Sequence, residues 1–120
     1  MEYVGTRWYK CDFHLHTMSS ECYADKNTYK EWVDEVCKKG LNCIAVTDHN
    51  DYRAIDTVRE IGNKKGITVF PGVEVTCDTS KIHMLILFDV DKTLLYCSSG
   101  TDNVNRLQVI LVIACSFKFP

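Results

Sequence analysis

The stretch Asp12-Phe13-His14-Leu15-His16-Thr17 sets the fold of this chain, because polar and apolar residues alternate in it as they do in a β-strand. Successive side chains of a strand point to opposite faces, so His14 and His16 share one face with Asp12. Two imidazoles with this spacing can close on one metal ion, with Asp12 as an oxygen ligand or as a residue that orients a ligand. A polar strand face with incidental histidines fits the pair equally well. Further ligands must therefore come from the rest of the chain.

The composition is that of a soluble globular protein with at most one domain. The chain has 120 residues, which is long enough to bury a hydrophobic core. Of these residues 46% are hydrophobic and 25% are charged. A net charge of -2 gives no electrostatic argument for nonspecific binding to nucleic acid or membranes. The N-terminus lacks a basic start followed by an apolar run, and the apolar run at 109–115 is far below the roughly 20 residues of a membrane span. We expect a cytoplasmic protein without membrane association.

The chain contains seven cysteines, an odd number with no Cys-x-x-Cys pair. A disulfide scaffold would need an export signal, and a zinc knuckle would need paired spacing. We expect reduced thiols that mostly serve as small core residues.

Periodicity predicts alternating strands and helices through residue 75. The expected elements are a strand at 8–16, a helix at 28–39, a strand at 43–46, a helix at 52–64, and a strand at 67–70 that is interrupted at Pro71-Gly72 and continues at 73–75. Thr28 and Glu31 form a capping-box pattern at the start of the first helix. Strands and helices with this spacing indicate a βαβαβ unit with a parallel sheet.

A fourth strand is expected at Ile82–Phe88, only about six residues after Val75, which is too few for a crossover helix. The third and fourth strands should therefore form an antiparallel hairpin that brings His83 beside Glu74. The run Val109–Cys115 fits either a buried strand or a short core helix.

The chain's four histidines all fall at strand ends or beside acids. The carboxyl ends of strands form the functional rim of parallel α/β folds, so His49 and Glu74 should join the His-x-His pair in a metal cluster. Asp48 fits two roles equally, orienting the ring of His49 or capping the second helix. Glu21, in the loop after His16, is either a metal ligand or a solvated side chain.

Four segments together resemble the PHP (polymerase and histidinol phosphatase) superfamily in order and spacing: Asp12–Thr17, Thr47-Asp48-His49-Asn50, Pro71-Gly72-Val73-Glu74-Val75 and Ile82-His83-Met84-Leu85. The resemblance covers about residues 7–88. The opening at residues 5–10 looks most like PHP domains at the front of large ATPase-fused proteins.

The resemblance implies an α/β fold, the N-terminal βαβαβ-plus-hairpin portion of a distorted (βα)7 barrel. It also implies two or three divalent metal ions, commonly zinc, manganese or iron, and hydrolysis of phosphate esters by metal-activated water. The implied ligand roles are His14 and His16 on the first metal, Glu74 bridging two metals, His83 on the second metal, His49 on the third metal, and Glu21 where the family usually has an Asp. The implied catalytic residues are Asp48, His49 and Glu74.

The chain departs from the family pattern after His83, where the further His and the Asp-x-His motif of PHP domains are missing. We therefore expect a partial PHP metal-binding domain at 1–90 and a tail of unclear structure at 91–120. Such a chain is a truncated or frameshifted product, or it needs a partner or self-association to complete the barrel.

The function predicted from the sequence is that of a metal-dependent phosphoesterase acting on a nucleotide, a nucleic-acid end or a small phosphate monoester. The alternative is a non-catalytic or incomplete PHP fragment that binds metal or serves as a regulatory or interaction module. A weaker third hypothesis is an accessory proofreading domain for a polymerase.

Overall fold

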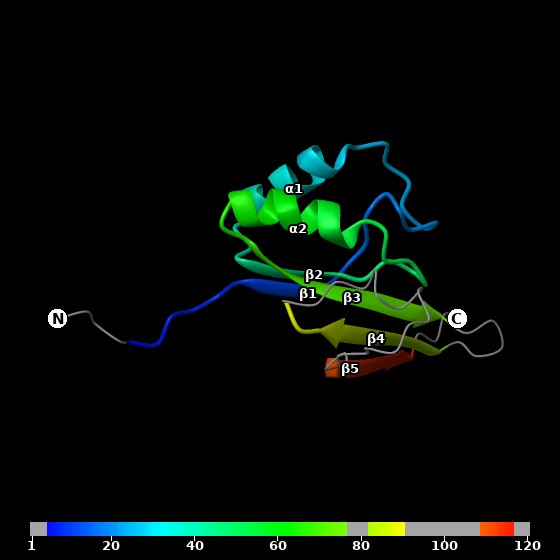
Figure 1. Cartoon of the computed structure of the whole chain (residues 1–120). Helices are drawn as coiled ribbons and strands as arrows, with labels where there is room; N and C mark the ends of the chain where they lie inside the picture. The colour runs from blue at the N-terminus through cyan, green and yellow to red at the C-terminus, as the bar shows by residue number, and fades with distance from the viewer. Residues whose placement is uncertain (1–4, 77–81, 91–108, 117–120) are drawn as a thin grey trace, which may run out of the picture.

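The computed structural model of the protein describes residues 5–76, 82–90 and 109–116, the last of these by their backbone alone. The elements are β1 (Cys11–Leu15), α1 (Tyr29–Lys38), β2 (Cys43–Val46), α2 (Ile55–Lys64), β3 (Thr68–Thr76), β4 (Ile82–Phe88) and β5 (Val109–Ser116). The strands form one sheet in the order β1-β2-β3-β4-β5. The pairs β1–β2 and β2–β3 are parallel, whereas β3–β4 and β4–β5 are antiparallel. This arrangement confirms the predicted α/β fold, a βαβαβ unit extended by a hairpin (Figure 1).

Helices α1 and α2 lie side by side over one face of β1, β2 and β3 (Figure 1). The capping box that begins α1 is present, since Thr28 and Glu31 each bond the backbone of the other. After the helix Gly40 adopts a φ of 70°, which a residue with a side chain rarely adopts. The core between helices and sheet comprises Trp32, Val33, Val36, Ile44, Val46, Ala54, Ile55, Val58, Ile67 and Val69. Burial of this apolar face is what attaches the helices to the sheet.

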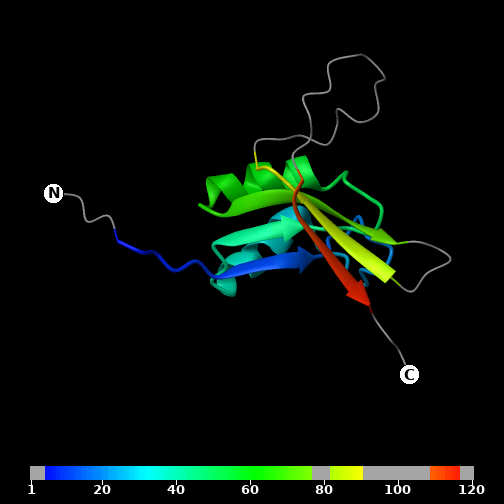
Figure 2. The ribbon, with the colours of Figure 1, turned by 90° about the horizontal axis from the view of Figure 1, so that it is seen from below.

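Strands β4 and β5 lie beyond β3 on the side away from the helices, and they run obliquely to β1 and β2 (Figure 2). Leu85 and Leu87 of β4 are buried. Ile82 and Met84 of the same strand are 48% and 38% exposed. Strand β2 of the parallel part is therefore buried throughout, whereas β4 of the antiparallel part is buried only at alternate residues.

Strand β3 is continuous through Pro71 and Gly72, so the predicted interruption at these residues was wrong. Pro71 pairs with Val46 at the last position of the parallel ladder, and Gly72 pairs with Leu87 at the first position of the antiparallel ladder. Proline is tolerated in a strand where its missing N–H is not needed. A Cβ at Gly72 would lie 2.9 Å from Cδ2 of Leu87 and 3.0 Å from the backbone carbonyl oxygen of Val46, so the position where the strand changes partner favours glycine.

Two predicted boundaries also shift. Strand β1 begins at Cys11 rather than Trp8, whose side chain is 93% exposed ahead of the strand. Helix α2 begins at Ile55 rather than Tyr52. Before it, the Asp51 side chain accepts hydrogen bonds from the backbone and guanidinium N–H groups of Arg53, which favours a turn.

The C-terminal prediction is resolved only in part, because residues 91–108 lie outside the described residues. The run at 109–115 forms the strand β5, the first of its two predicted alternatives. The division at residue 90 stays a prediction, although β5 pairs with β4 in the same sheet. None of the helices in the described residues is long and apolar enough to span a bilayer.

The prediction that the cysteines are mostly core residues is wrong for those the structure describes. Cys43 is buried, but Cys11, Cys22 and Cys37 are exposed, and all of them are free thiols. Burial raises the pKa of Cys43 to about 11, with a further contribution from the neighbouring Cys11.

Candidate metal centre

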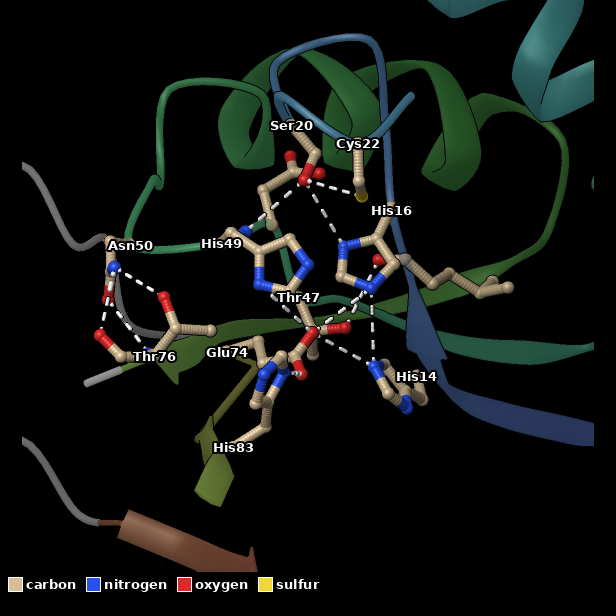
Figure 3. A network of polar contacts seen from close by, with 12 residues as sticks. His14, His16, Ser20, Cys22, Thr47, His49, Asn50, Glu74, Thr76 and His83 are labelled. Carbon is tan, nitrogen blue, oxygen red and sulfur yellow. Dashed lines mark hydrogen bonds and ion pairs between the residues drawn. The ribbon is translucent and has the colours of Figure 1, made fainter. Parts of the chain in front are cut away.

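The carboxylate of Glu74 lies at the centre of the site, contacted by all four of the chain's histidines (Figure 3). Its Oε2 is 3.0 Å from Nε2 of His14 and 3.1 Å from Nε2 of His16. The same oxygen is 3.5 Å from Nδ1 of His49. The other oxygen, Oε1, is 2.5 Å from Nδ1 of His83. The predicted convergence of the strand ends on one cluster is thus present.

Glu74 is held in place by backbone contacts on both sides of β3. Its N–H donates to the carbonyl of Asp48 at 3.1 Å, and its carbonyl accepts from the N–H of Asn50 at 2.9 Å. These bonds tie the loop after β2 to β3 and place His49 opposite Glu74. On the other side, β4 pairs with β3 so that His83 faces Thr76, as the predicted hairpin requires. The side chain of Glu74 is 1% exposed, so its surroundings fix its position.

A register shift in β1 orients the two histidines of the His-x-His pair toward Glu74. The pairing of β1 with β2 shifts register between Asp12 and Leu15. Within this segment the Asp12 carboxylate accepts a hydrogen bond from the backbone N–H of His14 at 3.1 Å. Asp12 therefore shapes the strand that carries the histidines, and it belongs to none of the candidate ligand groups among the described residues. The indole N–H of Trp32 in α1 donates to the carbonyl of His16 at 3.0 Å, which fixes the end of the segment.

Asp48 performs neither of the two roles considered from the sequence. Its carboxylate accepts hydrogen bonds from the backbone N–H and the hydroxyl of Thr17, both at 2.6 Å. Helix α2 has Ala54 at its N-cap, without a side-chain cap. Burial raises the pKa of Asp48, and the bonds from Thr17 oppose that rise. Asp48 therefore clamps the loop after β1 to the end of β2, next to His16. A catalytic role for Asp48 stays a prediction.

The surroundings of His16 and Glu74 favour a neutral imidazole at the first and an ionised carboxylate at the second. Burial lowers the pKa of His16, and the neighbouring His49 lowers it further. Burial alone would raise the pKa of Glu74, but hydrogen bonds from His14 and His83 outweigh it, so the pKa is lowered. Neutral imidazole and ionised carboxylate are the forms that bind metal ions.

The donor set fits a pair of divalent ions. Ligand atoms of His14, His16 and Glu74 lie within 4.8 Å of one another, and so do those of His49, Glu74 and His83. Glu74 belongs to both groups, as expected of a carboxylate shared by two ions. Nδ1 of His49 is buried and has no hydrogen-bond partner among the described residues, a condition that a metal ion would relieve. Imidazole and carboxylate together suit zinc, manganese and iron.

Glu21 is exposed and belongs to none of these groups, so its role as a ligand stays a prediction. The next residue, Cys22, forms a third group with His16 and His49, whose ligand atoms also lie within 4.8 Å of one another. The one signal for Cys22 in the sequence is its position directly beside Glu21, an expected ligand, whereas the prediction that the cysteines are mostly small core residues points away from such a role.

Comparisons with known proteins agree with this geometry. The sequence model of one family, described as the PHP domain, matches residues 12–109. A DNA polymerase III of the PolC type from Staphylococcus saprophyticus is 31% identical over 117 residues, which cover 86% of this chain and 8% of that protein. A phosphoribosyl 1,2-cyclic phosphate 1,2-diphosphodiesterase from Eggerthella lenta is 26% identical over 78 residues, 62% of this chain and 29% of that enzyme.

The fold is also similar to that of solved structures. One is a two-domain protein from Bacteroides vulgatus that contains a predicted PHP-like metal-dependent phosphoesterase. The match has a TM-score of 0.56 and 28% identity, and it covers 66% of this chain and 26% of that one. The chain thus spans well under half the length of each of these proteins.

Proposed function

Because the chain belongs to the PHP domain family, we propose that it carries the metal centre of a metal-dependent phosphoesterase and that Glu74 bridges two ions in it. The observation that supports this most is the buried Glu74 carboxylate with imidazoles facing both of its oxygens. Structural histidines seldom converge on one acid from separate strands. In this proposal His14 and His16 hold one ion, and His83 and His49 hold the neighbouring ion or ions.

Bound divalent ions would supply Lewis acidity toward a phosphate ester and lower the pKa of water. The chain's own residues provide orientation. Glu74 keeps a negative charge between the two histidine groups. Its backbone N–H donates to the carbonyl of Asp48 and its carbonyl accepts from the N–H of Asn50, and these two bonds fix its position. The hydrogen bonds from Thr17 to Asp48 hold the segment just after His16 against the end of β2, which limits the spread of ligand positions.

The substrate class in this proposal is a phosphate ester, including nucleotides and nucleic-acid ends. The names of the similar proteins support this class, since one is a DNA polymerase and another acts on a cyclic phosphate.

The non-catalytic alternative is favoured by a different observation. All four histidines of the chain are already at Glu74, so the chain has none for the further His and the Asp-x-His motif of the family. A site of this composition can bind metal without turnover.

Location in the cytoplasm also stays a prediction.

The test is metal content per chain, measured together with hydrolysis of bis(p-nitrophenyl) phosphate with and without manganese. Two or more ions per chain and turnover that disappears in His14→Ala would support the phosphoesterase. Bound metal without turnover would support the non-catalytic alternative. At most one ion and no turnover would contradict the proposal for this chain.

A matched pair of variants tests the bridging role. Glu74→Gln and Glu21→Gln remove the same charge, one from a buried carboxylate among imidazoles and one from an exposed loop. We expect Glu74→Gln to lose more metal than Glu21→Gln. Equal losses would show that the bridging role is misassigned.

A further inference from the structure

The loop after β1 carries an exposed thiol beside the imidazole cluster. Cys22 Sγ and ring nitrogens of His16 and His49 lie within 4.8 Å of one another (Figure 3). An exposed thiol adds little to packing, so burial does not account for a cysteine at this point.

Ser20 organises this part of the loop. Its hydroxyl lies 3.3 Å from Cys22 Sγ and 3.4 Å from Nδ1 of His16, and it accepts a hydrogen bond from the backbone N–H of His49 at 3.4 Å. The loop itself turns twice, through the bonds from Ser20 N–H to the Thr17 carbonyl and from Tyr23 N–H to the Ser20 carbonyl. Ser20 therefore contacts Cys22 and both histidines, and it fixes their positions relative to one another.

One of the two histidines is better placed to share an ion with Cys22. A neutral imidazole has one lone pair, so each ring serves one ion. Both ring nitrogens of His16 have polar partners, Nε2 at 3.1 Å from Oε2 of Glu74 and Nδ1 at 3.4 Å from the Ser20 hydroxyl. His49 approaches Oε2 of Glu74 less closely, at 3.5 Å from Nδ1, and this nitrogen forms no hydrogen bond among the described residues. His49 is thus the histidine with the weaker contact to Glu74, and in this inference it serves the ion beside Cys22 instead of the ion held by His83.

We propose that Cys22 supplies a thiolate ligand to a metal position that it shares with His49. This inference rests on the proposed metal centre and deepens it, since it replaces the oxygen ligand expected at Glu21 with sulfur. Thiolate is a soft ligand that favours zinc or cobalt over manganese. The position at Cys22 and His49 should therefore select zinc more strongly than the positions at Glu74, whose ligands are imidazole and carboxylate.

The test is a titration of the full chain, reduced and metal-free, with cobalt(II) as a spectroscopic substitute for zinc. A thiolate on cobalt gives a sulfur-to-metal charge-transfer band in the near ultraviolet, which imidazole and carboxylate ligands do not give. We expect the band in the parent chain, in Glu21→Gln and in Cys37→Ser, which removes another exposed thiol from α1. We expect Cys22→Ser to lose the band. Loss of a residue that only supports a metal ligand lowers metal affinity roughly 10- to 100-fold, so loss of the ligand itself should lower zinc affinity by at least that factor.

Alkylation of thiols, mapped by peptide mass spectrometry, provides a second measurement that needs no variant. Zinc should protect Cys22 and leave Cys37 reactive. Cobalt bound without the band, together with an unprotected Cys22, would overturn the thiolate ligand and leave the centre at Glu74 standing. A folded chain that binds no cobalt would overturn both. A band that persists in Cys22→Ser would assign the sulfur to a different cysteine and contradict the proposal.

Discussion

The parallel and antiparallel parts of the sheet differ in how they are covered. Strands β1 to β3 pack against α1 and α2, and each described residue of β2 is buried. In β4 only alternate residues, Leu85 and Leu87, are buried, and Ile82 and Met84 remain exposed. A strand that is hydrophobic throughout is typical of parallel sheets covered on both faces, whereas alternation is typical of a sheet with one wet face. The two parts therefore contribute unequally to stability.

The candidate metal centre lies where the two parts meet. β1 and the segments that follow β1 and β2 supply His14, His16 and His49, and β4 supplies His83. Glu74 joins them because β3 belongs to both ladders. The parallel part therefore supplies three of the four histidines, and the antiparallel part supplies the fourth.

The largest effect should come from removing apolar volume in the parallel part. Ile44→Ala in β2, where the side chain is fully buried, should lower the free energy of unfolding by about 2–5 kcal/mol. The matched change Ile82→Ala, at a half-exposed position of β4, should cost less than about 1 kcal/mol. Urea denaturation measures both changes. Equal costs would remove the distinction between the two parts.

The next effect concerns the clamp between the loop after β1 and the end of β2. Thr17→Val keeps the shape but removes the hydroxyl that donates to Asp48, leaving a buried carboxylate with one donor fewer. We expect a loss of about 1–3 kcal/mol in stability, together with weaker metal binding because His16 loses its support. Thr17→Ser should restore most of both. A Val variant as stable as the parent would show that Asp48 is satisfied without Thr17.

A smaller effect should follow from weakening the helix layer alone. Thr28→Ala removes the N-cap of α1 and should cost about 1 kcal/mol, with Thr28→Ser close to the parent. Hydrogen exchange should show lost protection in β2 and less change in the β3–β4 hairpin, because β3 packs against α2. Equal loss in both would mean that the sheet opens as one unit.

The smallest effect should be the pH dependence of the stability of the metal-free chain, because water still reaches the ring of His16. Burial lowers the pKa of His16, so the folded state binds its proton less tightly than the unfolded state, and stability falls as the pH drops below 6.5. Glu74, whose pKa is lowered by bonds from His14 and His83 despite burial, contributes stability above 4.5 that is lost as the pH falls further. We expect the melting temperature of the parent chain to decline as the pH falls from 8 to 4. His16→Gln is the control, and its melting temperature should not show the part of the decline that occurs at the higher pH values.

The sequence predicted the fold wherever the pattern was local. The capping box at Thr28, the buried run of β2 and the short connection before β4 each act through neighbouring residues, and each is present in the structure. The interruption at Pro71 was wrong because it treated proline as a local breaker. Its position between two ladders depends on strands far away in the sequence.

The candidate site was predictable as a set but not residue by residue. The histidines and Glu74 were found because strand ends meet at one edge. The bonds of Asp48 to Thr17 could not be found in this way, since they depend on how the loop after β1 folds back. The same loop decides that Cys22 and not Glu21 lies beside His49.

Strand β1 is the outermost strand of the described sheet, and it also carries the His-x-His pair. Its free edge presents backbone N–H and C=O groups that an incoming strand can pair with. An incoming strand would place the side chain opposite His14 on the face that carries the imidazole, beside the proposed metal centre. We therefore expect strand addition at this edge and metal binding at the proposed centre to be coupled. Metal should tighten strand addition by the same factor by which strand addition tightens metal binding.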